Sequence, residues 1–475
     1  MIVRKVKNSA GNISVQVGNY KGHSFRLVAH LGSARNEFEL QLLLKKADQL
    51  LISNNQYQLL PEAKARIVNL QKFSPIGYRH VYAYKVLEEY FSMIFPQADE
   101  LFKNMVIIRI VKPASKSESI RLLAEYFGVR YKKTAVFKAL LSFEKTAITR
   151  ATVEFASRNF GFDFSLVFYD VTTLYFESSQ SDELRKNGFS KDNKMNQPQI
   201  LIGLLVDVNG FPIDFNVFEG NKYEGHTLLP TIERFRAEHD IKTFTIVADA
   251  GMLSQNNLNE LERLGLFFIV AGRTAATPTE KLSGIAKVLN KQDGKTVSRI
   301  SASRKTIYHF SAVRERKDIH DLEKNLKKAE WAVNNPGKLL KRSKFVTGSQ
   351  LGSVTINQEL VEKYKMLAGI KSYVTNLLDV PNPKVIERYK DLWKVEKSFR
   401  ISKTDLEARP VFHRKKEMVC SHILTVFAAL AVSRLIEYKS KQSLKEFVHM
   451  AMQQIDCVFE DSVTKEVFTF RMSPH

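Results

Sequence analysis

The chain has 475 residues, 44% of them hydrophobic, which is enough to form the cores of about two to four domains. Its 72 Lys and Arg against 50 Asp and Glu leave a formal net charge of +22. That surplus favours a polyanionic partner, with nucleic acid ahead of an anionic membrane surface. The cysteines, Cys420 and Cys457, form neither a disulfide framework nor a cysteine-rich metal site, so we expect a reduced, intracellular protein.

The sequence gives no indication of a membrane-spanning helix or a secretory signal. The longest apolar run, residues 423–432 (ILTVFAALAV), is about half the ~20 residues that a span needs, so we expect a buried core helix. The N-terminal sequence MIVRKVKNSAGN lacks the apolar stretch of a signal peptide. We therefore expect a cytoplasmic protein without a membrane partner.

The first 150 residues change from strand-like to helical patterns. Residues 1–35 alternate apolar and polar positions around Gly18 and Gly22 and predict a small β-hairpin unit. Helical periodicity follows in residues 37–51 and 81–95. Residues 102–150 predict further short helices, and the segment RIVKPASK at 109–116 predicts a basic face like that of a helix-turn-helix DNA reader. A purely structural helical region is an equally good interpretation.

Residues 164–275 predict a mixed sheet flanked by helices. The predicted order is a strand (164–176), a strand pair around Asn209-Gly210, a helix, a strand (243–250), a helix and a last strand. Asn-Gly between apolar runs is a strong hairpin signal. The pattern then loosens until about residue 372, which predicts an insertion, and a strand-like run leads into residues 389–406.

Two acidic residues interrupt or end apolar strands of this block. Asp170 lies within FSLVFYDVTTLYF, and Asp249 follows the run TFTIVA. Strands that are apolar on both faces are normally buried, where an unpaired carboxylate is costly. We therefore expect both Asp residues at strand ends, sharing a compensating charge such as a metal ion. The structural alternative is that Asp170 caps a turn with Thr172 and Asp249 caps the next helix.

Residues 389–406 (YKDLWKVEKSFRISKTDL) predict one helix that carries a third carboxylate. Steps of seven residues place Tyr389, Glu396 and Lys403 on one face. The adjoining stripe is apolar and anchors the helix: Leu392, Val395, Phe399 and Leu406. A single helical Glu is usually a solvated surface residue, so Glu396 gains significance only beside the two Asp residues.

Three carboxylates suit metal-assisted cleavage of a phosphodiester. Two Mg²⁺ ions about 4 Å apart can stabilise both the attacking and the leaving oxygen, and Mg²⁺ prefers carboxylate and water oxygens. Asp170, Asp249 and Glu396 would suit two such ions, with Asp170 bridging them.

The motifs YDVTT around Asp170, VADAGM around Asp249, and the trio of Tyr389, Glu396 and Lys403 resemble the DDE transposases of bacterial insertion sequences. More narrowly, they are similar to the branch with a Tyr-(2)-Arg-(3)-Glu-(6)-Lys signature. The resemblance covers about residues 160–440, including RPVFHR after the Glu segment. It implies a ribonuclease H-like α/β core with an insertion between the second Asp and the Glu, which are 147 positions apart here (396 minus 249).

The resemblance also implies an activity and its partners. The implied activity is Mg²⁺-dependent cutting and joining of double-stranded DNA at terminal inverted repeats, with Mn²⁺ able to substitute for Mg²⁺. The implied active form is a homodimer on DNA. Its implied location is the bacterial cytoplasm, at the nucleoid. The implied catalytic, metal-binding residues are Asp170, Asp249 and Glu396, and Tyr389 and Lys403 would grip the transposon end. The predicted domains are 1–150 (N-terminal, DNA-binding), 151–275 and 373–440 (the two parts of the core), 276–372 (insertion) and 441–475 (tail).

The sequence departs from the branch signature at one position. Its Arg, four residues before the Glu, is replaced by Leu392, which belongs to the apolar stripe. Arg400, one turn after Glu396, is our candidate for the missing phosphate contact.

Three further residues have weaker functional interpretations. His226 and His413 could approach the site, although a single His more often has a structural role. Trp331 could stack on a displaced base, with core packing as the favoured alternative.

Two other classes of function stay open. The protein could be a metal-dependent nuclease that does not join strands, or a catalytically silent DNA-binding relative. An intact acidic triad disfavours the silent relative, and no residue distinguishes a nuclease from a transposase.

Overall fold

The structure is a computed structural model, and it describes residues 2–9, 11–53, 73–177, 180–188, 197–252, 254–335, 344–347, 355–461, 465 and 467–472. The chain divides into two compact units. The first comprises residues 1–77 with 458–469, and the second comprises residues 78–457 with 470–475. The domain boundaries that we predicted at 150, 275, 372 and 440 do not coincide with this division, and they stay predictions.

The first unit contains a three-stranded antiparallel sheet followed by a helix. Strands β1 (Ile2–Lys7), β2 (Ile13–Lys21) and β3 (Ser24–Ala34) pair in the order β1-β2-β3, and helix α1 (Glu37–Ser53) follows. The buried side chains of Val15 and Val17 form the small core of this unit together with residues of α1. The hairpin prediction missed β1, because its sequence IVRKVK carries three basic residues and is largely exposed.

The second unit begins with a helical layer, as the periodicity predicted. Its helices bury Phe91, Phe102 and Val106 in the main core. The helices are α2 (Val81–Ile94), α3 (Glu100–Val111), α4 (Lys116–Leu122), a π-helical turn η2 (Leu123–Phe127), α5 (Lys133–Ala139) and α6 (Lys145–Phe160).

An eight-stranded mixed sheet forms the centre of the second unit. Strand β5 (Leu166–Tyr175) pairs in parallel with β8 (Thr245–Ala248), which pairs in parallel with β9 (Phe267–Ala271). On its other side β5 pairs with the antiparallel hairpin of β6 (Gln199–Val206) and β7 (Pro212–Glu219). Helices α7 (Leu228–His239) and α8 (Gln255–Arg263) connect β7, β8 and β9. The predicted order of elements and the mixed α/β architecture are confirmed.

The segment expected to be an insertion shares this sheet. The strand order is β10-β11-β14-β9-β8-β5-β6-β7, in which β10 (Thr296–Ser301) and β11 (Arg304–Phe310) join through β14 (Ile370–Thr375). Residues 276–372 therefore continue the central sheet. Their remaining elements are α9 (Thr279–Leu289), α10 (Ala312–Asn334), the short strands β12 (Val346–Thr347) and β13 (Thr355–Ile356), and α11 (Gln358–Leu367).

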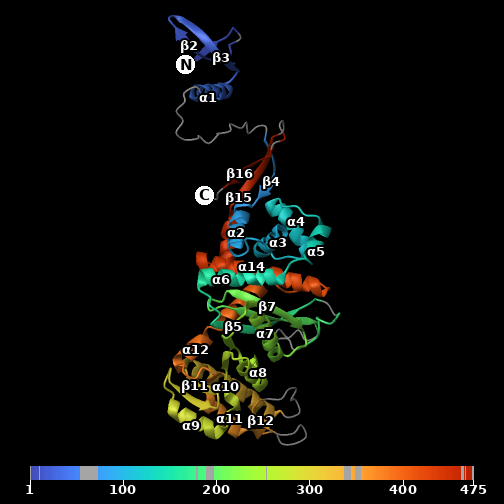
Figure 1. Cartoon of the computed structure of the whole chain (residues 1–475), viewed down its shortest axis with the longest axis vertical. Helices are drawn as coiled ribbons and strands as arrows, with labels where there is room; N and C mark the ends of the chain where they lie inside the picture. The colour runs from blue at the N-terminus through green and yellow to red at the C-terminus, as the bar shows by residue number, and fades with distance from the viewer. Residues whose placement is uncertain are drawn as a thin grey trace. The chain divides into compact units, whose positions relative to one another are not determined.

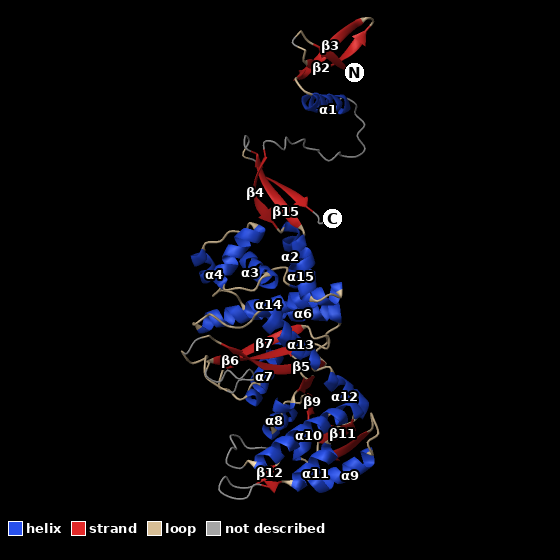
Figure 2. Cartoon of the chain, turned by 180° about the vertical axis from the view of Figure 1, so that it is seen from behind, coloured by secondary structure: helices blue, strands red, loops and turns tan. Residues whose placement is uncertain are grey.

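Helix α14 (Lys416–Ser440) is the apolar core helix that the sequence predicted. It is long and apolar enough to cross a membrane, but 89% of its most apolar window is buried within the protein. In Figures 1 and 2, α14 and α6 lie on one side of strands β5–β7, and α7 lies on the other side. A core helix packed between helices and a sheet must be apolar on all sides, which explains its composition.

The C-terminal residues add a helix and a small sheet. Helix α15 (Leu444–Gln453) begins with a capping box between Ser443 and Glu446. Strands β15 (Ile455–Asp461), β16 (Val467–Met472) and β4 (Phe73–Arg79) form a three-stranded sheet in the order β16-β15-β4.

Strand β7 at the edge of the central sheet carries a fully buried carboxylate. The side chain of Asp214 is 0% exposed and pairs with Arg234 on α7 and with Lys145 on α6, whose Nζ lies 3.4 Å from Asp214 Oδ1. Burial lowers the pKa of Lys145 to about 8. The carboxylate therefore holds cations from two helices at this edge of the sheet.

We expect Asp214→Ala to lower the free energy of unfolding by about 3 kcal/mol, because it leaves two partly buried cations without their partner. The control is Glu154→Ala, which removes an exposed i,i+4 pair with Arg158 on α6 and should cost about 0.5 kcal/mol or less. Chemical denaturation of both variants measures the difference. Equal losses would show that the buried carboxylate does not stabilise the sheet.

Candidate active site

Asp170 and Asp249 lie on neighbouring parallel strands at the same level. The register of β5 and β8 pairs Tyr169 with Ala248, so the next residue on each chain is one of the two acids. Asp249 directly follows β8, as expected for a strand end. Asp170 lies in the middle of β5, so the prediction that it ends a strand is wrong. Strand β5 continues beyond β8 because it still pairs with the hairpin strand β6.

The structural roles considered for these two acids do not fit. Asp170 cannot cap a turn, because it lies within extended β5, where it pairs with Leu204 of β6. Its Oδ1 accepts a hydrogen bond from the N–H of Val171 at 2.7 Å, and its side chain is half-buried. Asp249 is exposed, and the N-cap of α8 is Ser254, whose hydroxyl accepts from Asn257 N–H. Neither of the two structural roles therefore explains these carboxylates.

The segment carrying Glu396 is not one helix. Helix α12 (Asn382–Lys390) ends after Tyr389, α13 (Trp393–Arg400) carries Glu396, and a π-helical turn η7 (Ile401–Asp405) carries Lys403. The break consists of tight i→i+3 hydrogen bonds, from Leu392 N–H to Tyr389 and from Lys394 N–H to Asp391. Tyr389, Leu392 and Val395 recur every three residues and are all buried, which a tighter turn satisfies better than a straight helix.

The apolar stripe of this segment anchors it as predicted. Leu392, Val395, Phe399 and Leu406 are at most 7% exposed. Glu396 is exposed on the remaining surface of α13, and α13 packs against β5. The predicted common face of Tyr389, Glu396 and Lys403 on one helix is therefore wrong, although α13, which carries Glu396, packs against the strand that carries Asp170.

Tyr389, just before the break between α12 and α13, contacts Asp249. Its hydroxyl donates a hydrogen bond to Asp249 Oδ1 at 3.1 Å, and its ring packs edge-on against Tyr373 with centroids 5.0 Å apart. Burial raises the pKa of Tyr389, and the nearby charges of Asp249 and Glu396 raise it further. The phenol therefore stays protonated, and its environment shows that Asp249 and Glu396 lie near the same side chain.

Lys371 on β14 lies among these residues, and sequence reasoning missed it. Its ammonium lies 4.4 Å from the centre of the Tyr389 ring. Burial lowers the pKa of Lys371, while the charges of Asp249 and Glu396 oppose that shift. The lysine thus supplies a local counter-charge to two of the three acids. The predicted strand began at Tyr373, so Lys371 fell outside it.

Glu224 is a fourth carboxylate near the site, and no pattern in the sequence indicated it. It begins a short 3₁₀ turn, η3 (Glu224–His226), that packs against the 3₁₀ turn η4 (Ala250–Met252) following Asp249. Burial raises the pKa of Tyr169, and the charges of Asp170 and Glu224 add to the effect. Glu224 is therefore close to the strand position of Asp170.

A cleft of about 980 Å³ adjoins Asp249 and Lys371. Four basic side chains line it, together with Asp318 and Asp321 of α10. Its basic residues come from the loop after β9, from α10, from the segment before β12 and from β14: Arg273, Arg314, Lys344 and Lys371. A cleft with basic walls beside a carboxylate site is suited to a phosphate backbone.

Asp170 and Asp249 are suited to bind a divalent metal ion for two reasons. Mg²⁺ prefers carboxylate oxygens, and the strand register makes the two residues neighbours. Within the described ranges, no three His, Cys, Asp or Glu side chains converge into a formed metal cluster. Lys371 and the Tyr389 hydroxyl instead satisfy part of the acidic charge.

The other predicted residues have different positions. Arg400 is exposed at the end of α13. Lys403 is half-buried and lines an apolar pocket with Thr172 and Leu174 of β5, so its DNA contact stays a prediction. His226 packs against Tyr223 beside Glu224.

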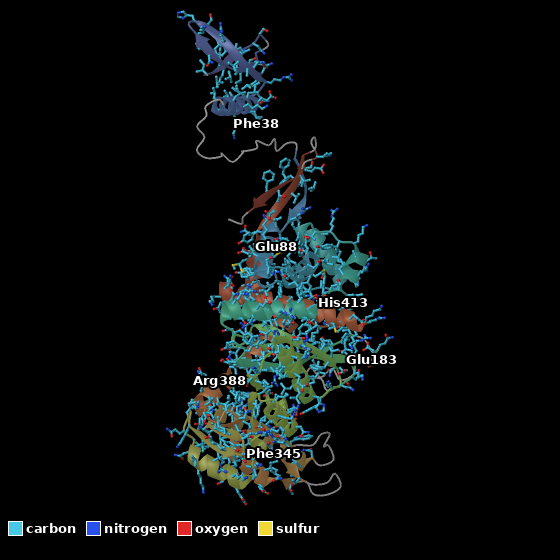
Figure 3. The ribbon with its side chains drawn as sticks, viewed as in Figure 1. Phe38, Glu88, Glu183, Phe345, Arg388 and His413 are labelled. Atoms are coloured by element: carbon cyan, nitrogen blue, oxygen red, sulfur yellow. The ribbon has the colours of Figure 1, made fainter. Side chains whose placement is uncertain are left out.

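Two further predictions concern residues away from these acids. Trp331 is 53% exposed, so the preferred prediction of core packing is wrong. His413 lines a different cavity from Asp249, near the N-terminal end of α14 (Figure 3).

The chain matches the family model described as "Transposase DDE domain" over residues 161–432, more than half of its length. It therefore belongs to the transposase DDE domain family. No curated protein gives a significant match. A solved structure titled "Cryo-EM structure of piggyBac transposase synaptic complex with hairpin DNA (SNHP)" shares 11% identity, with 85% of this chain and 74% of that chain covered. Its TM-score of 0.39 is too low to establish a common fold.

We expect Tyr389→Phe to lower the free energy of unfolding by about 1 kcal/mol, because it removes one hydrogen bond and keeps the ring packing. Tyr389→Ala should cost about 3–5 kcal/mol, since it also leaves a cavity. Denaturant titrations separate the two. Similar losses for both variants would mean that the hydroxyl, not the ring, anchors the segment.

Proposed function

We propose that the protein is a DNA transposase that cuts an insertion sequence at its terminal inverted repeats and joins the ends to target DNA. The observation that carries the proposal is the register of β5 and β8, which places Asp170 and Asp249 side by side within the matched transposase domain. Glu396 on α13, packed against β5, supplies the third carboxylate. In this proposal the central sheet is ribonuclease H-like, and residues 276–372 are the family's insertion.

The three carboxylates have a common chemical role in the proposal. They would hold divalent metal ions, Mg²⁺ or Mn²⁺ and two in number, which when bound activate the attacking oxygen and stabilise the leaving oxygen of a phosphodiester. The chain's own part is to fix the carboxylates on rigid elements, because small displacements of catalytic groups slow reactions strongly. Tyr389 orients Asp249 through its hydrogen bond, and Lys371 limits the repulsion between Asp249 and Glu396.

DNA binding would use the basic surface of the chain. The net charge of +22 supplies sequence-independent affinity for the phosphate backbone. The cleft beside Asp249 is lined by four basic side chains. Arg400 and Lys403 follow Glu396 along the chain and add further positive charge. We further propose that the helices before residue 150 bind DNA, that a homodimer holds the two ends, and that the protein acts in the bacterial cytoplasm, at the nucleoid.

The deciding experiment uses purified protein, Mg²⁺ and a labelled DNA that carries the flanking ends of the gene. We expect excision followed by joining to a second DNA. Asp170→Asn should reduce both steps by at least about 10³-fold, because it removes a carboxylate charge from the proposed metal site. End binding and thermal stability should be retained, and Glu183→Gln, an exposed acid outside the site, should leave both steps unchanged.

The outcomes distinguish the classes of function. Cleavage without joining would favour a nuclease and contradict the proposal of strand transfer. Tight end binding without any metal-dependent cleavage would indicate a catalytically silent DNA-binding protein.

The proposed contact of Arg400 has its own test. If Arg400 binds one DNA phosphate, Arg400→Ala should weaken end binding and reduce the slope of log affinity against log salt by about 0.9. Arg263→Ala is the matched control, since Arg263 on α8 is an exposed arginine already paired with Glu260 and lies outside the proposed DNA-binding helices. Fluorescence anisotropy at several salt concentrations measures the slopes, and an unchanged slope for Arg400→Ala would exclude the contact.

A further inference from the structure

A second polar cavity lies between α3, the start of α4, the segment after η7 and the start of α14. Its volume is about 280 Å³. The residues that matter for its chemistry are Arg109, Lys116, Glu407, Arg409, His413 and His422. None of them belongs to the acidic site described above.

Two basic residues of this cavity are buried. Arg109 is 4% exposed and Lys116 is 3% exposed, so the predicted basic face of residues 109–116 is wrong for these two. Arg109 Nη2 donates to the carbonyl of Ala114 at 2.8 Å, and Lys116 Nζ donates to Thr425 Oγ1 at 3.3 Å. In the described ranges no carboxylate forms an ion pair with either side chain. Isolated buried charges of one sign are costly and call for a counter-ion.

Two imidazoles complete the wall of the cavity. The rings of His413 and His422 lie 5.7 Å apart, centre to centre. Burial, followed by the charges of Lys116 and Arg109, lowers the pKa of His413 to about 4, and the pKa of His422 is lowered as well. Both rings are therefore neutral at pH 7, and each has one N–H donor, which in His422 faces the Ala408 carbonyl.

Two buried polar atoms of this cavity have no partner within the described residues. Nε of Arg109 and Nδ1 of His422 are buried, and neither has a hydrogen-bond partner among the described residues. The other ring nitrogen of His422, Nε2, donates to the carbonyl oxygen of Ala408 at 3.1 Å, so Nδ1 of the neutral ring is an acceptor. Buried polar atoms are nearly always paired in proteins, so an unpaired guanidinium nitrogen beside a cavity indicates a missing acceptor.

The acidic residue of the cavity does not provide that acceptor. Glu407 lines the cavity but is exposed. Its charge raises the pKa of Arg109, yet burial dominates and the pKa of Arg109 falls to about 10. The walls therefore carry an excess of positive charge and of N–H donors.

We propose that this cavity binds a phosphate group. A tetrahedral oxyanion would accept hydrogen bonds from Arg109 Nε and Lys116 Nζ and would compensate the buried charge of Arg109. It would also favour the charged form of Lys116, whose pKa is lowered by burial and by the charge of Arg109. The volume is larger than one phosphate needs, which leaves room for an attached sugar or for water. The phosphate group could belong to a DNA backbone or to free inorganic phosphate, and both would bind the cavity in the same way.

The cavity is connected to the strand that carries Asp170. Arg409 lies over the ring of Tyr175 at 5.3 Å, and the N–H of Val411 donates to the carbonyl of Tyr175. Tyr175 is the last residue of β5, five positions after Asp170. The segment that lines the cavity thus contacts the far end of the strand that carries Asp170. The proposal that DNA supplies the phosphate, and this part alone, rests on the proposed function.

The first test measures thermal unfolding of the full chain in sodium phosphate and in sodium chloride of equal ionic strength. Wild type should gain about 2 °C or more in Tm from phosphate. Lys116→Met should lose this gain while its Tm in chloride is unchanged or higher, because an uncompensated buried charge is replaced by an apolar chain of similar length. Lys305→Met, a buried lysine that donates to Leu378 and Val380 carbonyls elsewhere, should keep the gain.

A second pair of variants avoids the buried residues. Phe412 lines the mouth of the cavity and is 64% exposed, so substitutions there should fold normally. Phe412→Glu should abolish the phosphate-dependent gain by repulsion, whereas Phe412→Gln should retain it. Absence of a phosphate effect in wild type, or equal effects in these two variants, would overturn the proposal.

Measurements of DNA binding identify the source of the phosphate. If a backbone phosphate binds here, Lys116→Met and Phe412→Glu should each lower the salt slope for a short duplex, and inorganic phosphate should compete with the duplex. Unchanged slopes together with an intact phosphate gain would support binding of the free ion. Asp170→Asn should keep the phosphate gain in every case, so failure of the catalytic proposal and failure of this one are distinguishable.

Discussion

The parallel pairing of β5 with β8 is the constraint on which the acidic site depends. Hydrogen bonds between these strands fix Tyr169 opposite Ala248, so the following acids are neighbours whatever the surrounding side chains do. Flanking helices bury both strands, and this burial explains why the sequences of β5 and β8 are apolar. A site built on a buried sheet is held more firmly than one built on loops alone, and Glu396 then only has to be brought to it by α13.

The sequence predicted the sheet well because its signals are local. Alternation, the Asn209-Gly210 turn and the strand that ends before Asp249 each depend on a few consecutive residues. The break after Tyr389 could not be predicted in this way. Leu392 is an acceptable residue in a helix, and the tight turn arises from packing that the local sequence does not contain.

Residue type misled the sequence interpretation where charged residues are buried. Arg109 and Lys116 were expected to form an exposed basic face, as Arg and Lys usually do. Their burial depends on α14, whose residues follow them by some 300 positions in the chain. Lys371 was missed for a similar reason. It acts as a counter-charge only because folding brings Asp249 and Glu396, which are distant in the sequence or in other elements, close to it.

The sheet also limits how the protein can be divided. Because β10 and β11 pair through β14 with the strand next to β8, the segment between the second Asp and the Glu is not a detachable module. Deleting β10 and β11 would expose the backbone edge of β14, the strand that carries Lys371, to pairing with other chains. Any shortened form of this protein would have to cover that edge to remain soluble.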